Sequence, residues 1–311
     1  MNKKTTVISV IIAIAIVFAC GLFEQNKQKL GFKGDAYYSV ADSDGGIVEF
    51  YSEPQKVAVL FSSLAHAWSV AGGDIAVTVG ESVQRGICDS DVLLVDGGAG
   101  KTIDTELLVS YEPDLVIYSA DVPGQVKAAQ LMKDNGVNCL GVRLDSFEDY
   151  LKVLDSFCGI LGTKENYEKY GKQTEKRINE ILSLAAKQQE KKILFIRSGS
   201  SESSAKAKKA GDNFAAQMLE DLGCFNIADN APVLLDGLSV EEVLVQKPEY
   251  IFISIMGDEK AGKAYMNSVL ESEAWKNVEA QVVFLPKDMF QYKPCENWDK
   301  AYEYLYDILF K

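Results

Sequence analysis

The chain has 311 residues, of which 47% are hydrophobic and 25% charged, so it is long enough to bury one large core or two medium ones. Its formal net charge of −13 argues against nucleic acid as a partner and against electrostatic adhesion to an anionic membrane surface. The six cysteines are widely spaced and form no C-x-x-C pair, which argues against a thiolate zinc site and a dense disulfide framework, although one pair could be bridged.

The first twenty residues have the features of an export signal. Lys3 and Lys4 precede an apolar run from Val7 to Ala19, which as a helix would rise only about 20 Å, too little to span a ~30 Å hydrocarbon core comfortably. The segment "VFAC" resembles a bacterial lipobox, which implies lipidation of Cys20. We predict a lipoprotein signal peptide over residues 1–20 and a tether over 21–36. An ordinary cleaved signal and an uncleaved signal anchor are the alternatives.

The next segment favours β structure followed by alternating strands and helices. Residues 37–61 contain alternating β-forming residues around the turn "DSDGG", which predicts a hairpin, and then a buried strand at Val57–Phe61. Further strands are expected at residues 75–80, 91–96, 114–119 and 137–142, and helices at 65–71, 104–111, 124–135 and 146–161.

The segment "DVLLVDGGAGKTID", residues 91–104, suggests a strand that enters a phosphate-binding loop. A P-loop needs G-x-x-x-x-G-K-[ST], and the position five residues before Gly100 is Val95 instead of glycine. The sequence therefore argues against nucleotide binding. We expect the loop to lie on the rim of a small-molecule pocket, with Lys101 facing the ligand or solvent.

A helical pattern then runs without interruption over residues 164–189, which is about 39 Å and long for a globular protein. After it the alternation restarts, with strands expected at 192–198, 249–255 and 281–286 and helices at 213–223, 240–245, 265–275 and 298–310. We predict an α/β fold of two Rossmann-like lobes with mainly parallel sheets, residues 37–162 and 191–311, joined by one long rigid helix, residues 163–190, with a ligand cleft between the lobes.

Several phrases, in this order, resemble the class III solute-binding proteins of ABC importers, the family for ferric siderophores, haem and cobalamin. They are "PQKVAVL", "IDTELLVSYEPDLVIYS", "FAAQMLEDLGCFNIAD" and "LSVEEVLVQKPEYIFIS". The resemblance covers about residues 37–311 and departs from the family pattern at Cys224, at Cys295 and at Glu249, which replaces an aspartate.

This resemblance implies a monomeric binding protein, and no enzyme, that is anchored by lipid on the outer face of the bacterial cytoplasmic membrane. It implies an ABC permease, to which the protein delivers the ligand, and through the permease its ATPase, as partners. It also implies one docking glutamate per lobe, placed by motif at Glu106 and Glu220, which would pair with permease arginines. No cofactor of its own is expected.

The ligand is expected to be an iron chelate, haem or cobalamin, because a single histidine, His66, argues against capture of a bare transition metal. Side chains that follow the predicted strands are the candidates for ligand contact, since ligands settle at the carboxyl ends of parallel strands. The candidates are His66, Lys101, Tyr118, Arg143, Arg197, Met256 and Tyr292. Histidine, methionine or tyrosine would suit haem, whereas arginines and aromatic rings would suit a siderophore.

Two other classes of function remain open. The chain has no G-x-S-x-G elbow, H-E-x-x-H or G-x-G-x-x-G motif, but catalysis by paired carboxylates leaves no signature in one sequence. An exported lipid-anchored enzyme is therefore an alternative. A lipid-anchored ligand sensor on the same two-lobe scaffold is the other.

Overall fold

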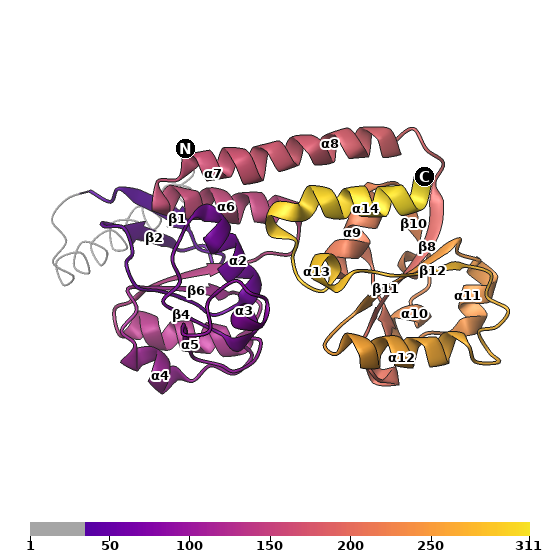
Figure 1. The fold of residues 1–311 in the computed structure, drawn as a ribbon, viewed down its shortest axis with the longest axis horizontal. Coiled ribbons are helices and arrows are strands. Elements are labelled where there is room, and N and C mark those ends of the chain that lie inside the picture. The colour runs from indigo at the N-terminus through magenta and orange to yellow at the C-terminus, as the bar shows by residue number, and fades with distance from the viewer. Residues whose placement is uncertain (1–34) are drawn as a thin grey trace, which may run out of the picture.

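The structure is a computed structural model that describes residues 35–311, so the predicted signal peptide, Cys20 and most of the tether lie outside the described residues. Two lobes lie side by side beneath a long helical segment that spans both of them (Figure 1). The predicted fold class, two α/β lobes joined by one long helix, is confirmed.

The first lobe has a five-stranded parallel sheet in the order β5-β4-β3-β6-β7. Its strands are β3 (Val57–Val59), β4 (Val77–Thr78), β5 (Leu93–Leu94), β6 (Leu115–Ser119) and β7 (Asn138–Val142). Its helices are α2 (Ser62–Ala71), α3 (Gly80–Gln84), α4 (Thr105–Ser110), α5 (Pro123–Asp134) and α6 (Phe147–Leu161). The predicted hairpin precedes this sheet as β1 (Tyr38–Ala41) and β2 (Ile47–Phe50), which pair antiparallel.

Local sequence explains where several of these helices begin. The Asp104 side chain accepts a hydrogen bond from the Leu107 amide and caps α4, and Pro123 opens α5, where a missing N–H is tolerated. Ser146 and Asp149 form a reciprocal capping box at the start of α6. Gly162 ends α6 in the left-handed conformation, with φ of 69°.

The helical segment between the lobes runs from residue 164 to residue 185 and consists of α7 (Lys164–Tyr167), a π-helical turn (Glu168–Lys172) and α8 (Gln173–Ala185). The sequence pattern predicted this helix but not the π turn, which often marks a functional position in a helix. Thr174, Ile178 and Ala185 are buried along one face of α8. That face packs on the C-terminal helix α14 (Trp298–Phe310), which lies beside α8 in Figure 1.

The second lobe has a sheet in the order β10-β8-β11-β12, in which these four strands are parallel, and β9 pairs antiparallel with β8. Its strands are β8 (Lys191–Ser198), β9 (Lys206–Ala207), β10 (Cys224–Asn226), β11 (Tyr250–Ile255) and β12 (Gln281–Phe284). Its helices, besides α14, are α9 (Phe214–Asp221), α10 (Val233–Asp236), α11 (Val240–Gln246), α12 (Glu259–Leu270) and α13 (Lys287–Phe290). Short 3₁₀ turns lie at Glu202–Ser204, Ala210–Asp212, Ile227–Asp229 and Cys295–Asn297.

The structure differs from the predicted elements at several points. The helix expected at residues 265–275 begins earlier, because the Asp258 side chain accepts from the Ala261 amide and starts α12 at Glu259. The strands β9 and β10 and the helices α3, α10 and α13 were not predicted. They span only two to five residues, too few to show a periodic pattern.

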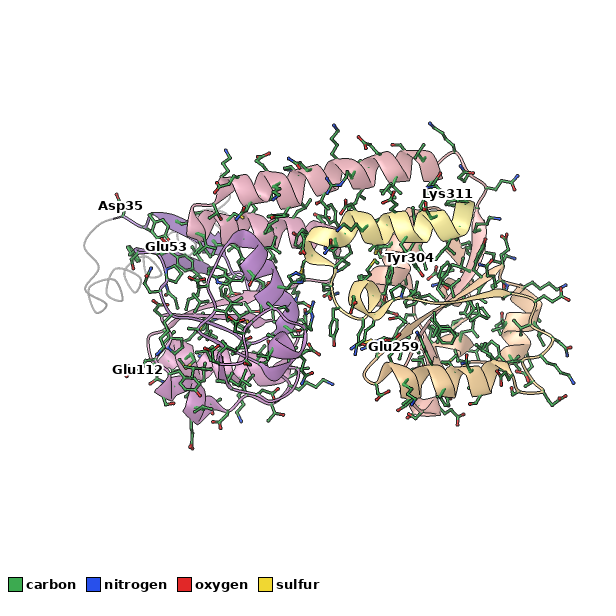
Figure 2. The ribbon with its side chains drawn as sticks, viewed as in Figure 1. Asp35, Glu53, Glu112, Glu259, Tyr304 and Lys311 are labelled. Carbon is green, nitrogen blue, oxygen red and sulfur yellow. The ribbon has the colours of Figure 1, made fainter. Side chains whose placement is uncertain are left out.

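One apolar cluster is continuous between the two lobes. It includes Trp68 and Phe157 of the first lobe and Phe195 and Phe252 of the second. Trp298 lies at their junction, with its ring centroid 5.9 Å from that of Phe147 on α6 and 5.6 Å from that of Phe214 on α9. Figure 2 shows Tyr304 on the underside of α14, where its ring packs against Phe290. Packing of this kind favours modest relative movement of the lobes.

Candidate functional site

Residues 35–311 form two cavities at the interface of the lobes, and the larger has a volume of about 1050 Å³. The first lobe contributes residues of α2 and α3, the bridging helix contributes two side chains, and the second lobe contributes α13 and the segment that follows it. The lining residues are His66, Ser69, Val70, Gln84, Arg85, Gly86, Ile87, Asn166, Tyr170, Lys287, Asp288, Met289, Tyr292, Pro294, Glu296, Asn297 and Lys300. This volume is at the upper end for small-molecule sites, so the cavity suits a bulky ligand.

His66 joins the lobes at the edge of this cavity through its contact with Glu296, in which Nε2 lies 3.1 Å from the carboxylate. Burial lowers the pKa of His66, but its contacts with Cys295 and Glu296 outweigh burial and raise the pKa to about 10. Burial raises the pKa of Glu296, and the contacts with His66 outweigh it, so the net shift of that pKa is downward. Both shifts favour the ionised pair at neutral pH.

Arg85, at the end of α3, forms a second contact between the lobes. Its guanidinium lies 4.2 Å from the ring centroid of Tyr292 in the second lobe, within the range of a cation–π interaction. Arg85 Nη1 donates to Ser62 Oγ at 2.9 Å, which fixes the side chain against the start of α2. Burial lowers the pKa of Arg85 from its usual value.

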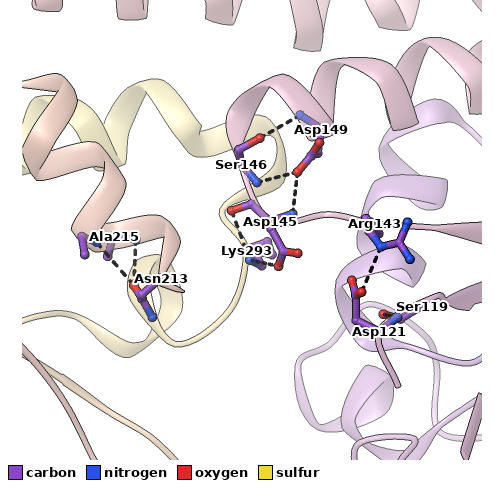
Figure 3. A network of polar contacts seen from close by, with 10 residues as sticks. Ser119, Asp121, Arg143, Asp145, Ser146, Asp149, Asn213, Ala215 and Lys293 are labelled. Carbon is purple, nitrogen blue, oxygen red and sulfur yellow. Dashed lines mark hydrogen bonds and ion pairs between the residues drawn. The ribbon is translucent and has the colours of Figure 1, made fainter. Parts of the chain in front are cut away.

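A second interlobe cavity, of about 440 Å³, lies on the other side of the segment that contains Lys293. Its lining residues are Phe61, Asp145, Ser146, Arg197, Ala210, Gly211, Asp212, Asn213, Phe214, Gln217, Met256, Phe290, Gln291 and Lys293. Lys293 Nζ lies 3.1 Å from Asp145 Oδ1, just before α6, as Figure 3 shows. The same Nζ lies 4.7 Å from the ring centroid of Phe214. Burial lowers the pKa of Lys293, and Asp145 opposes that effect.

The structure divides the predicted ligand contacts between the two cavities. His66 and Tyr292 line the larger one, and Arg197 and Met256 line the smaller one. Within residues 35–311 these are the four candidates that face either cavity.

The other three candidates lie elsewhere in the first lobe. Tyr118 is 2% exposed, and its hydroxyl is hydrogen-bonded to Lys133 Nζ at 3.2 Å inside the lobe. Arg143 is exposed and pairs with Asp121 at 3.0 Å, as Figure 3 shows. Lys101 is exposed in the loop between β5 and α4, whose backbone touches the start of α5 at Gly124. None of the three lines the two interlobe cavities.

The glutamates expected to dock a permease are both exposed, Glu106 on α4 and Glu220 on α9. Helix α9 lies close to α14, since Tyr302 of α14 donates to Asp221 at 2.6 Å. Cys20, the expected lipidation site, lies outside the described residues.

Sequence reasoning did not single out Arg85, Lys287, Asn166 or Tyr170, all of which line the larger cavity. Arg85 follows the short helix α3, which was not predicted, so no strand end marked its position. Asn166 and Tyr170 belong to the bridging helix, and Tyr170 lies in the π turn. Tyr170 continues the three- and four-residue spacing of the apolar positions in that helix, so the sequence pattern did not mark it as a cavity residue.

No group of three or more histidine, cysteine or acidic side chains that could hold a metal ion occurs within the described part of the chain. The five cysteines found there, Cys88, Cys139, Cys158, Cys224 and Cys295, are all free thiols. Within the same range, no helix has both the length and the apolar composition that a membrane span requires.

Comparison with solved structures identifies similar folds. An ABC transporter substrate-binding protein from Listeria monocytogenes is 14% identical, with 83% of this chain and 99% of that chain covered and a TM-score of 0.67. Staphylococcus aureus SirA, complexed with staphyloferrin B, is 18% identical, with 88% and 97% covered and a TM-score of 0.64. Staphylococcus aureus IsdE, complexed with haem, is 15% identical, with 82% and 99% covered and a TM-score of 0.66.

A search of curated proteins gave no match. In contrast, residues 57–288 match a sequence family described as periplasmic binding protein. The match begins at β3 and ends within α13, so it includes both sheets and the helix between them. Members of this family are binding proteins, so the prediction of a binding protein instead of an enzyme is confirmed, and membership implies a location outside the cytoplasm. This chain belongs to the periplasmic binding protein family.

Proposed function

We propose that this protein is the substrate-binding component of an ABC importer, which captures an iron chelate, haem or cobalamin between its lobes and delivers it to a permease. The observation that carries this proposal is the cavity of about 1050 Å³ at the interface of the lobes. Its size suits a chelate or tetrapyrrole better than a bare ion, and its walls come from both lobes and the bridging helix. The similar structures of SirA with staphyloferrin B and IsdE with haem support this ligand class.

Native mass spectrometry of the protein purified from its own host tests the proposal, because a tightly held ligand is identified by its mass. We expect a bound species of the size of an iron chelate, haem or cobalamin. Turnover of an offered sugar or ester, with no such ligand bound, would contradict it.

Titration with haemin separates the main ligand candidates. If haem is the ligand, a Soret band develops and is lost in Tyr292→Phe, or in His66→Ala where haem binding first breaks the pair with Glu296 and removes the imidazole proton. If a siderophore is the ligand, haemin gives no spectral change and a ferric hydroxamate or catecholate quenches the intrinsic fluorescence.

Permease docking is proposed through one exposed glutamate per lobe. Glu106 is the second residue of α4, which is capped by Asp104 and leads into β6. In the second lobe, Glu241 is also exposed, and it is the second residue of α11. Like α4, helix α11 is capped by the residue before it, Ser239, and is followed by a strand, β11. The matching positions of α4 before β6 and of α11 before β11 favour Glu241 as the partner of Glu106, whereas the sequence phrase favoured Glu220.

Uptake of labelled ligand by cells that carry single Glu→Gln variants tests this proposal. We expect variants at Glu106 and at either Glu241 or Glu220 to reduce uptake with ligand affinity unchanged. The matched control is Glu180→Gln on the exposed face of α8. Normal uptake in all variants would favour a ligand sensor over an importer component.

The lipid anchor is proposed from the lipobox resemblance at Cys20. A Cys20→Ala variant is expected to leave the membrane fraction. Retention of that variant in the membrane would indicate an uncleaved signal anchor.

A further inference from the structure

Arg85 is a cation without a carboxylate partner at the wall of the larger cavity. Within residues 35–311 it forms no ion pair, although its side chain is half-buried and burial lowers its pKa. Its Nη1 donates to Ser62 Oγ at 2.9 Å, and Nη2 lies 3.5 Å from His66 Nδ1. Nε makes no hydrogen bond with any described residue, so part of the guanidinium fork is available to a ligand. Glu81 and Asp288 act on Arg85 electrostatically and oppose the effect of burial on its pKa, but neither forms an ion pair with it. An anionic ligand group in direct contact with the guanidinium would compensate its lost hydration more fully.

Lys287 of the second lobe lies near the ring of Tyr292, which Arg85 also contacts. Its Nζ is 5.9 Å from the ring centroid of Tyr292, compared with 4.2 Å for the Arg85 guanidinium. Lys287 Nζ donates to the carbonyl oxygen of Gly257 at 3.2 Å and, within the described range, forms no ion pair. Tyr292 therefore has near its ring one cation from each lobe.

The charge of the lining is opposite to that of the whole chain. Basic residues in the lining are His66, Arg85, Lys287 and Lys300, and acidic residues are Asp288 and Glu296. Glu296 is already paired with His66. Three basic side chains and one carboxylate, Asp288, remain, within a chain of net charge −13. A local positive field in an acidic protein concentrates anions at that place.

We propose that Arg85 and Lys287 together bind an anionic oxygen group of the transported ligand, so that the ligand bridges the two lobes beside the Tyr292 ring. This inference rests on the proposed function and narrows it. The ligand is an anionic chelate whose free carboxylate or phenolate oxygens face these two cations, and neutral chelates are selected against.

Selection against neutral ligands follows from desolvation. A neutral ligand in the cavity removes water from Arg85 and supplies no anion in exchange, which leaves a buried donor without a partner. An anionic ligand gains charge-assisted hydrogen bonds, and a planar carboxylate matches the guanidinium fork in two bonds. Because the two cations belong to different lobes, the same group also favours the closed arrangement of the lobes.

The test uses two pairs of probes that differ in charge but little in shape. Haemin, with its two propionates, is compared with its dimethyl ester. A trianionic ferric tricatecholate is compared with a neutral ferric trihydroxamate. The two pairs also separate the two sources of the anionic oxygens, propionate and catecholate. Affinities are measured by fluorescence quenching with the purified protein. We expect one anionic probe to bind roughly 10- to 100-fold more tightly than its neutral counterpart, as for one or two charge-assisted hydrogen bonds.

Variants assign the effect to the two cations. Arg85→Gln and Lys287→Gln are each expected to weaken binding of the anionic probe roughly 10-fold or more and to leave the neutral probe unchanged. Arg85→Lys keeps the charge without the planar fork and is expected to lie between Arg85→Gln and the wild type. Lys127→Gln, on the exposed face of α5, is the matched control and is expected to have no effect. Added salt should weaken the wild type more than Arg85→Gln, a readout that does not depend on how well the variants fold.

The possible outcomes separate this inference from the proposed function. A neutral probe that binds as tightly as its anionic counterpart, or an Arg85→Gln variant with unchanged affinity for the anionic probe, overturns the inference and leaves the proposed function standing. Failure of every probe to bind overturns the inference, and the proposed function falls with it only if native mass spectrometry also finds no bound chelate, haem or cobalamin.

Discussion

Gly100, in the loop that resembles a nucleotide-binding segment, is predicted to be required for folding of the first lobe. Its φ is +76°, in the left-handed region. A Cβ at this position would lie 2.1 Å from the carbonyl oxygen of Leu60 and 2.7 Å from Gln125 Nε2. The Gly100 amide also donates to Asp96 at 2.6 Å, and its carbonyl accepts from Gln125 at 3.0 Å. The loop is therefore folded onto the carboxyl end of β3, and Gly100 provides the close approach.

The cost of Gly100→Ala has three parts. The left-handed conformation costs alanine about 1–2 kcal/mol. The contact with the Leu60 carbonyl, a backbone atom that cannot rotate away, adds about 1–3 kcal/mol by analogy with overpacking. Loss of the Gln125 hydrogen bond adds about 0.5–1.5 kcal/mol. We expect a total loss of roughly 2.5–6.5 kcal/mol in the free energy of unfolding, a large fraction of typical stability.

Two other glycines separate these contributions. Gly136 has a φ of +81° and no atom within 4 Å of its virtual Cβ, so Gly136→Ala is expected to cost only the backbone term of about 1–2 kcal/mol. Gly124 has no positive φ, and its virtual Cβ lies 2.2 Å from the Lys101 carbonyl oxygen, so Gly124→Ala isolates the steric term of about 1–3 kcal/mol.

Urea unfolding followed by tryptophan fluorescence gives the three free-energy differences. We expect Gly100→Ala to lose the most free energy of unfolding, and Gly136→Ala and Gly124→Ala to lose less. The reasoning would be refuted by a Gly100→Ala variant that loses no more stability than Gly136→Ala. That result would mean that the loop does not lie against β3 in solution.

Three further predictions concern the buried polar groups and the ligand. The Asp42 side chain is only 5% exposed and pairs with Lys133 at 3.1 Å. Lys133→Met should therefore lower the free energy of unfolding in urea by about 2–4 kcal/mol, because it leaves the Asp42 carboxylate buried without its partner. If the double variant Lys133→Met with Asp42→Asn is no more stable than Lys133→Met alone, the pair has no such role. Burial raises the pKa of Cys139 and of Cys224 to about 12. Both thiols should therefore resist iodoacetamide in the native protein while the half-buried Cys88 reacts, and peptide mass spectrometry measures the labelling of each. Equal labelling of the three cysteines would be incompatible with the structure. ATP should not shift the melting temperature whereas the physiological ligand should raise it, and a shift with ATP would revive the nucleotide interpretation.

Much of the fold could be predicted because the local pattern was strong. The alternation of apolar strands and amphipathic helices predicted two parallel sheets, and the turn at Asp42–Gly46 predicted the hairpin. Prediction failed where an element depends on its neighbours. The strand β10 has only three residues, and its pairing with β8 is what makes it a strand. The start of α12 depended on the cap at Asp258, which the apolar pattern did not reveal.

The candidate site was less predictable, and Tyr118 illustrates the reason. All five residues of β6 are buried, so no alternation of polar and apolar residues indicates which face each side chain occupies. The structure turns Tyr118 toward Lys133 instead of toward the cleft. Its position at a strand end was correct, but the direction of its side chain was set by packing on Gly141.

The sequence by itself determined the class of fold and the family resemblance, because these follow from periodicity and from the order of phrases along the chain. Only the tertiary structure decided which side chains meet. Arg85 and Tyr292 are more than two hundred positions apart, as are His66 and Glu296, and nothing local in either segment specifies its partner. Those contacts arise when α2 and α3 of one lobe face α13 and its following segment in the other, and the cavity exists only there.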